Sequence, residues 1–227
     1  MSWTVAAGRS SVGVVFSYLS GLGLGFSLIV AIGAQNLFVL RQGLRRERVL
    51  LTAAICAVSD AVLIVLGVSG IGLVLQAVPW LFDAVRWAGA AFLIGYGVLA
   101  ARRALRPSGE VLVVDAAPAP AQAGSVAVAV RTQTMPVVLT CLALTWLNPH
   151  VYLDTVFLLG SVASTHGDAR WAFAGGALVA SVVWFFGLAL GARFLSPWLS
   201  TPRAWRVLDG VIAVVMVALG LSLVLSH

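Results

Sequence analysis

Two carboxylates lie inside long apolar runs of the sequence, Asp60 in AVSDAVLIVLG and Asp154 in HVYLDTVFLLG. An ionisable side chain in the middle of a membrane-spanning segment costs about 2.5–3.5 kcal/mol, so it is expected to face a partner or a water-filled cavity. The alternative is structural, namely a carboxylate that reaches the lipid headgroups from a helix end or pairs with a buried arginine. No basic residue lies within a helical turn or two of Asp60, whereas Asp154 is close to Gly160 and a following loop. Asp60 is therefore the stronger candidate for a functional carboxylate.

The residues before Asp154 predict a break in its helix, because Asn148 is followed by Pro149. Proline disfavours the helical conformation before it, whereas Asn is a favoured helix cap and Pro a favoured first residue, so a second half-helix is predicted to start at Pro149. Its unpaired N–H groups would suit an anion such as a substrate carboxylate. The alternative is a simple proline kink. His150 lies four residues before Asp154 and either shares a proton with it or is an interfacial residue without a role.

Two amides, Gln35 and Asn36, lie in the first apolar run (IGAQNLFVLRQG) after the helix-weakening Gly33. They are candidates either to hydrogen-bond a ligand or to join neighbouring helices. The remaining motifs are interpreted structurally: close helix packing explains Gly21, Gly23 and Gly25, and the aromatic run WFF (184–186) is packing. The histidines have no metal-ligand spacing, so neither a metal site nor a cofactor is predicted.

The composition indicates the environment in which these polar groups act. Of 227 residues, 61% are hydrophobic and only 10% are charged, whereas a soluble domain has about 25% charged residues. The mean hydropathy of +1.04 also excludes a disordered chain. The net charge of +6 comes with arginines in short clusters between apolar runs, a pattern that fits membrane topology and not nucleic-acid binding.

Six apolar runs are candidates to cross the hydrocarbon core, which takes about 20 residues. They cover residues 14–40, 49–75, 87–101, 137–160, 171–192 and 207–225. Backbone polar groups in lipid must bond within each segment, and the runs do not alternate as barrel strands do. The sequence therefore predicts an all-α polytopic membrane protein with six transmembrane helices.

The arginines predict the orientation of these spans. Eleven lie in the connections after the first, third and fifth spans, and only Arg9, Arg86 and Arg170 lie on the other side. By the positive-inside rule, both termini are outside and the long central loop is in the cytoplasm.

The central segment 102–136 is rich in Ala, Pro and Ser, including APAPAQAGS, and is interpreted as a flexible linker. It separates a first three-helix half (14–101, after an N-terminal segment 1–13) from a second half (137–227). Because each half has an odd number of spans, a shared fold would place them as inverted repeats. Asn36 and Asn148 correspond in this arrangement.

Four segments resemble the signature stretches of the LysE family of basic amino-acid exporters, including its arginine and lysine exporters. They are GAQNLFVLRQGLRRE (33–47), SDAVLIVLG (59–67), LTWLNPHVYLDTVFLLGS (144–161) and WFFGLALGA (184–192). The resemblance implies export of L-arginine or L-lysine across the bacterial cytoplasmic (inner) membrane, driven by the proton motive force, with no enzymatic activity. It also implies that the functional membrane aspartates are Asp60 and Asp154. The family usually has Gly-Pro where this chain has Gly33-Ala34, which predicts a less sharply broken first helix.

Two alternatives remain at this point. One is a six-span thiol-disulfide electron carrier that uses Cys56 and Cys141, although neither has the Pro or CxxC context that activates a thiol. The other keeps the fold and exports another amino acid or a cation. In the favoured hypothesis the partners are a basic amino acid, protons and the lipid bilayer. In the same hypothesis, the cationic amino acid and the proton compete for one carboxylate. The sequence is also compatible with a homodimer.

Overall fold

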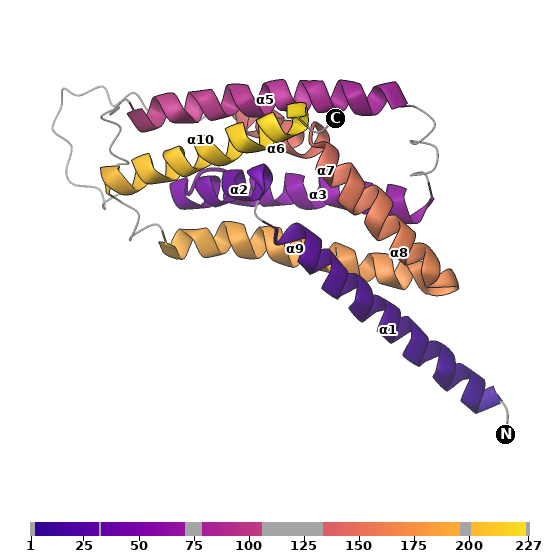
Figure 1. Cartoon of the computed structure of the whole chain (residues 1–227). Helices are drawn as coiled ribbons and strands as arrows, with labels where there is room; N and C mark the ends of the chain where they lie inside the picture. The colour runs from indigo at the N-terminus through magenta and orange to yellow at the C-terminus, as the bar shows by residue number, and fades with distance from the viewer. Residues whose placement is uncertain (1–2, 32, 71–78, 106–133, 196–200, 226–227) are drawn as a thin grey trace, which may run out of the picture.

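The computed structural model describes residues 3–31, 33–70, 79–105, 134–195 and 201–225, and in these ranges it is helical with no strand (Figure 1). The predicted all-α fold is confirmed. The helices are α1 (Trp3–Ile29), α2 (Ala34–Arg45), α3 (Val49–Val68), α5 (Pro79–Leu105), α6 (Thr134–Trp146), α7 (Pro149–Val151), the π-helix η1 (Tyr152–Leu158), α8 (Leu159–Thr165), the 3-10 helix η2 (Gly167–Ala169), α9 (Arg170–Leu195) and α10 (Pro202–Leu225).

Five of the helices in the described ranges, α1, α3, α5, α9 and α10, are long and apolar enough to cross a membrane. A sixth span is formed if α6 and the helical segment Pro149–Thr165, which meet at an angle of 58°, cross together. The described ranges therefore hold five or six candidate spans, against the six predicted. Large apolar side chains such as Phe16, Val214 and Leu225 are exposed on the outside of the bundle, as expected for residues that face lipid.

The predicted first span, 14–40, is wrong as a single helix. α1 ends at Ile29, and the chain turns through an extended Gly33 (φ −125°, ψ 173°) before α2 begins. With 12 residues, α2 is about 18 Å long and too short to cross a hydrocarbon core of about 30 Å. The break forms even though Ala34 replaces the proline of the family pattern, and the expectation that it is less sharp than with the proline stays a prediction.

Other span limits differ as well. α5 extends the predicted span 87–101 at both ends, which gives it the full length of a membrane helix. α3 ends at Val68, and residues 71–78 of the predicted second span lie outside the described residues. Most of the predicted linker 102–136 also lies outside them, between the end of α5 and the start of α6. The division into inverted halves stays a prediction.

Close helix packing explains two of the three α1 glycines that were interpreted in this way, Gly21 and Gly25. A Cβ at Gly21 would lie 1.9 Å from the carbonyl oxygen of Phe173 in α9, and one at Gly25 would lie 3.0 Å from Cα of Ala177. Gly23 faces open space, so the packing interpretation is wrong for that residue. α1 therefore packs against α9 along one glycine-bearing face.

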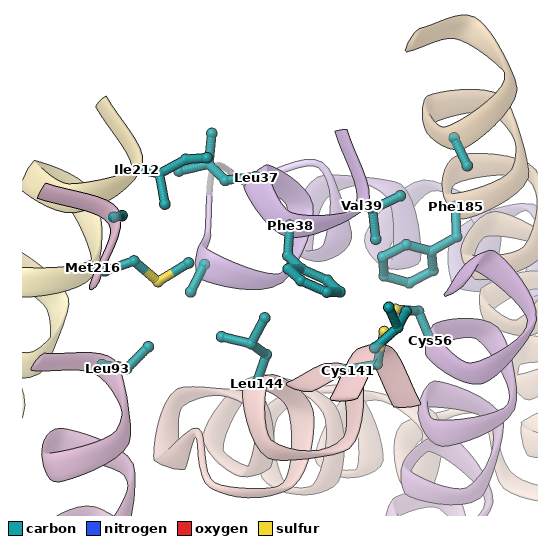
Figure 2. Close-up of a cluster of buried hydrophobic side chains, with 14 of the residues drawn as sticks. Leu37, Phe38, Val39, Cys56, Leu93, Cys141, Leu144, Phe185, Ile212 and Met216 are labelled. Carbon is teal, nitrogen blue, oxygen red and sulfur yellow. The ribbon is translucent and has the colours of Figure 1, made fainter. Parts of the chain in front are cut away.

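A cluster of buried apolar side chains from α2, α3, α5, α6, α9 and α10 fills the centre of the bundle (Figure 2). Phe38, Leu144 and Met216 are at most 4% exposed. Cys56 and Cys141 lie against each other in the same cluster and are free thiols with no exposed surface. We call this cluster the apolar layer below.

Candidate functional site

Asn36 holds the break between α1 and α2. Its Nδ2 donates to the carbonyl oxygens of Ile29 and Ala31, both at 2.8 Å, and its Oδ1 accepts a bond of 3.3 Å from Nε1 of Trp184. Ile29 is the last residue of α1, so Asn36 satisfies a carbonyl group that the helix end leaves without an intrahelical partner. Trp184 was interpreted as packing alone, and this hydrogen bond corrects that interpretation.

The predicted break at Asn148 is confirmed. Asn148 has extended backbone geometry, and its Oδ1 accepts a hydrogen bond of 3.2 Å from the backbone N–H of His150. Pro149 is the first residue of the new helix and is buried. The hydroxyl of Tyr152 donates to the carbonyl oxygen of Trp146 at 2.9 Å and so bridges the break from the other side.

The helix that restarts at Pro149 passes into a π-helical segment, η1, which contains Asp154. The backbone N–H of Leu159 donates to the carbonyl oxygen of Asp154, five residues earlier. π-helical turns are rare and frequently occur at functional sites. Nothing in the residue pattern predicts this turn, because π-helices have no strong propensity signature.

A cavity of about 330 Å³ lies between the two helix breaks. Six of the seven predicted site residues line it, and they are Gln35, Asn36, Asp60, Asn148, His150 and Asp154. Pro149 does not line the cavity. The remaining walls include the apolar side chains of Leu28, Leu93, Phe185 and Leu219, from α1, α5, α9 and α10. Side chains that are far apart in the sequence therefore meet at one chamber.

Asp60 is the more buried of the two predicted carboxylates, with 6% of its surface exposed. Its Oδ2 accepts a hydrogen bond of 2.9 Å from the hydroxyl of Ser181 in α9. No arginine forms an ion pair with it within the part of the chain that the structure describes. The structural alternative, a carboxylate neutralised by a buried arginine, is therefore not what the fold provides.

Asp154 is half-buried at the cavity wall, and His150 is exposed near the start of the same helical segment. Across the described ranges no hydrogen bond or ion pair joins their side chains. The proton-sharing pair therefore stays a prediction. Both groups reach the same chamber as Asp60, which places two carboxylates and one imidazole at a single cavity.

Gln35 brings a hydrogen-bond donor to the cavity. Its Nε2 is buried and has no hydrogen-bond partner among the described residues. It lies in the first turn of α2, where helical N–H groups also have no intrahelical acceptor. Together with the positive end of the helix that starts at Pro149, Nε2 of Gln35 makes part of the wall suited to a negatively charged group.

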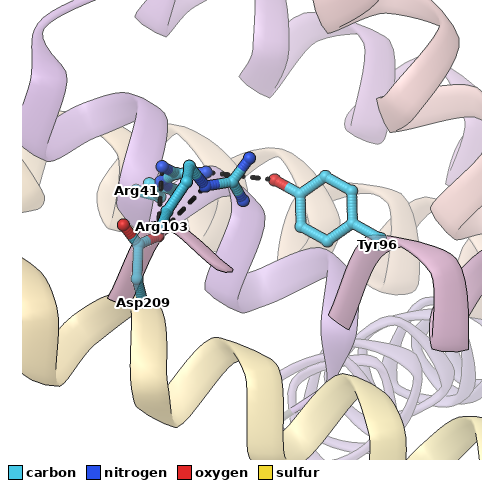
Figure 3. Close-up of polar contacts among 4 residues, drawn as sticks. All are labelled: Arg41, Tyr96, Arg103 and Asp209. Atoms are coloured by element: carbon cyan, nitrogen blue, oxygen red, sulfur yellow. Dashed lines mark hydrogen bonds and ion pairs between the residues drawn. The ribbon is translucent and has the colours of Figure 1, made fainter. Parts of the chain in front are cut away.

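Sequence reasoning missed a second polar cluster, formed by Arg41, Asp209, Arg103 and Tyr96 (Figure 3). Arg41 was placed in a loop, but it lies in α2 and is 5% exposed. Asp209 offered a signal, because it is a third carboxylate within a predicted span. Ser181 offered one too, as a single hydroxyl in the apolar run 171–192. Only the fold reveals their partners.

The family model for the LysE type translocator matches residues 26–227. This match covers the last four residues of α1 and all the described helices that follow, including both breaks and all the cavity residues named above. The chain belongs to the LysE family. It is accordingly a multi-pass protein of the bacterial cytoplasmic membrane, and the family assignment supports a role in amino-acid export.

Relatives within the LysE family carry transporter names. A Mycobacterium tuberculosis protein named provisionally as an amino-acid transporter is 47% identical over 88% of this chain and 92% of its own length. The lysine exporter LysE of Corynebacterium efficiens is 40% identical over 92% and 98%. The arginine exporter protein ArgO of Pectobacterium carotovorum is 42% identical over 91% and 95%. No solved structure matches the chain.

Proposed function

We propose that this LysE-family chain exports L-arginine, L-lysine or both across the bacterial cytoplasmic membrane, in exchange for protons. The observation that carries the proposal is that Asp60 and Asp154 line one cavity, which the N-terminus at Pro149 also reaches through Asn148 and His150. The names of the lysine and arginine exporters among the relatives support the same cargo.

The cavity has the groups that a basic amino acid requires. A guanidinium or ammonium side chain needs fixed negative charge, which Asp60 and Asp154 supply. An α-carboxylate needs positive potential and a hydrogen-bond donor, which the positive end of the helix that starts at Pro149 and Nε2 of Gln35 respectively supply. A cavity of about 330 Å³ has room for one amino acid.

Proton coupling follows from competition for a carboxylate. When the cation leaves, a carboxylate enclosed by apolar walls is costly to keep charged and without a partner, so binding of a proton replaces binding of the cation. One carboxyl group then carries either a proton or cargo but not both, which is the simplest form of antiport. Movement of the two halves about the cavity would expose it to each side in turn.

The positions of Cys56 and Cys141 do not support the alternative of a thiol-disulfide electron carrier. Cys56 and Cys141 are close enough to contact each other, but both are enclosed in the apolar layer with no exposed surface. An electron carrier needs access for a redox partner, which these sulfurs do not have. Export of another amino acid or a cation would keep the same fold and differ only at the cavity. A homodimer stays a prediction.

The cargo is tested by efflux from bacterial cells that are loaded with dipeptides. We expect cells that produce the chain to release arginine, lysine or the arginine analogue canavanine faster than cells without it, and to release a neutral amino acid at the same rate. Release of the neutral amino acid alone would reject the proposed cargo. Collapse of the proton gradient with an uncoupler should stop the additional release.

A further inference from the structure

Asp209 in α10 holds two arginines from two other helices (Figure 3). Nη2 of Arg41 in α2 lies 3.0 Å from Oδ1 of Asp209, and Nε of Arg103 in α5 lies 3.7 Å from the same oxygen. The side chains of Arg41 and Asp209 are 6% and 10% exposed. The carboxylate is therefore a largely buried group that already binds guanidinium.

The bonding within this cluster is incomplete. Oδ1 of Asp209 has no aligned hydrogen-bond donor, despite its short distance to Arg41. Nε of Arg41 and both Nε and Nη2 of Arg103 are buried without a hydrogen-bond partner in the described ranges. A buried ion pair offsets its desolvation cost only when its geometry and remaining hydrogen bonds are good. The two arginines therefore leave hydrogen-bonding capacity of the Asp209 carboxylate unused, which a cation with better-aligned donors can take up.

The cluster lies near the end of the bundle where α2, α5 and α9 finish in arginines, namely Arg45, Arg103 and Arg193. Asp209 is ten residues before the cavity residue Leu219 in α10, a distance of about 15 Å along a helix. Side chains of the apolar layer, including Phe38, Leu144 and Met216, fill the bundle between them (Figure 2). By the positive-inside rule this end faces the cytoplasm. Asp209 is thus the carboxylate on the cytoplasmic side of the apolar layer, whereas Asp60 lies at the cavity on the other side.

We propose that Asp209 is a second cation-binding site, which loads the guanidinium or ammonium side chain of cargo from the cytoplasm and which Arg41 occupies in the state seen here. This inference rests on the proposed export of basic amino acids. Exchange of Arg41 for cargo replaces one ion pair with another, and Arg103 remains beside the carboxylate throughout. The exchange also frees α2 from α10. Because α2 carries Gln35 and Asn36 at its other end, occupation of Asp209 is linked to the cavity wall.

The two partners of the pair should have opposite effects on cargo binding. In inside-out membrane vesicles with an imposed proton gradient, KM for labelled arginine reports loading from the cytoplasmic face. Asp209→Asn removes the site and should raise KM about tenfold, which is the change expected from the loss of one charge-assisted hydrogen bond. Arg41→Gln removes the competing cation and should lower KM. Asp83→Asn is the matched control, because Asp83 is exposed and lies at the opposite end of α5 from Arg103.

The sign of the two changes decides the outcome. If the ion pair only stabilised the bundle, Asp209→Asn and Arg41→Gln would change in the same direction. Both variants would show a higher KM, or both would be present in lower amounts in the membrane. Either of these shared outcomes overturns the proposal. Unchanged KM in both variants overturns it as well. Asp209→Glu keeps the charge and should keep KM close to that of the unaltered chain. Vesicles with the unaltered chain that transport neither arginine nor lysine would reject the proposed function itself, before any variant is compared.

Discussion

Ser181 donates a hydrogen bond of 2.9 Å to Oδ2 of Asp60 and thereby joins α9 to α3 beside the cavity. Ser181 is fully buried, and Asp60 is 6% exposed. One face of the carboxylate is therefore fixed to a helix of the predicted second half, while the residue also lines the chamber. A movement of α9 relative to α3 changes the hydrogen bonding of Asp60 directly, which links the geometry of the bundle to the group that binds cargo.

Ser181→Ala should weaken both the fold and export. Loss of the hydroxyl leaves a buried carboxylate oxygen without its donor, at a cost of about 1–3 kcal/mol. We expect a lower thermal midpoint for the purified protein in detergent and slower export per molecule in the membrane. Ser161→Ala is the control, because Ser161 is exposed and its hydroxyl donates to the carbonyl oxygen of Leu158, three residues earlier, and not to another part of the bundle. Equal effects of the two substitutions would contradict the role given to Ser181.

Gly21→Ala and Gly23→Ala should differ sharply. A methyl group at Gly21 would lie 1.9 Å from the backbone oxygen of Phe173, so α1 would have to move away from α9. At Gly23 there is nothing within 4 Å. We predict that Gly21→Ala reduces the amount of folded protein in the membrane and that Gly23→Ala does not, as measured by quantitative immunoblotting. A tolerated Gly21→Ala would show that α1 does not pack against α9 in this way.

Replacement of both cysteines by serine should leave the cargo specificity and the proton dependence of export unchanged. Cys56 and Cys141 contribute volume to the apolar layer, and serine is only slightly smaller. The cost is confined to stability, because each serine hydroxyl needs a hydrogen-bond partner in the core. Efflux from dipeptide-loaded cells provides the measurement. Complete loss of export, with normal amounts of the double variant in the membrane, would instead favour a redox role.

The two helix breaks show how far the sequence predicts this site. The break at Asn148 was predictable, since Asn-Pro both ends one helix and begins another. The break before α2 was not, because Gly33-Ala34 has no such signature and the turn depends on Asn36, whose partners lie in α1 and α9. Asp60 and Asp154 could be selected from their apolar surroundings, but their common cavity requires the fold.

The ion pair of Arg41 and Asp209 is a feature that the sequence does not predict. Arg41 follows an apolar run and resembles the arginines of a cytoplasmic loop, and only the packing of α2 against α10 buries it. Asp209 lies two residues inside the predicted last span, where an interfacial position is the ordinary expectation. A pair between helices so distant in sequence depends on tertiary contacts, which local patterns do not encode.

Cargo binding should weaken as the pH falls. A carboxylate that binds either a proton or the cation binds cargo only in its charged form, so protonation raises the apparent Kd by about tenfold per pH unit below the titration range. We predict this trend for arginine binding to the purified protein by calorimetry, with proton release on binding at intermediate pH. Titrations in buffers of different ionisation enthalpy measure the number of protons released. A Kd for arginine that does not change between pH 5 and pH 9 would contradict competition between the proton and cargo at a carboxylate.

The most direct test of the account measures arginine and lysine efflux from dipeptide-loaded cells that produce Asp60→Asn or Asp154→Asn, with Asp83→Asn as the matched exposed control. The account predicts that each cavity variant reaches the membrane in normal amounts and exports neither amino acid, whereas the control exports both at the normal rate. Undiminished efflux from both cavity variants would contradict it.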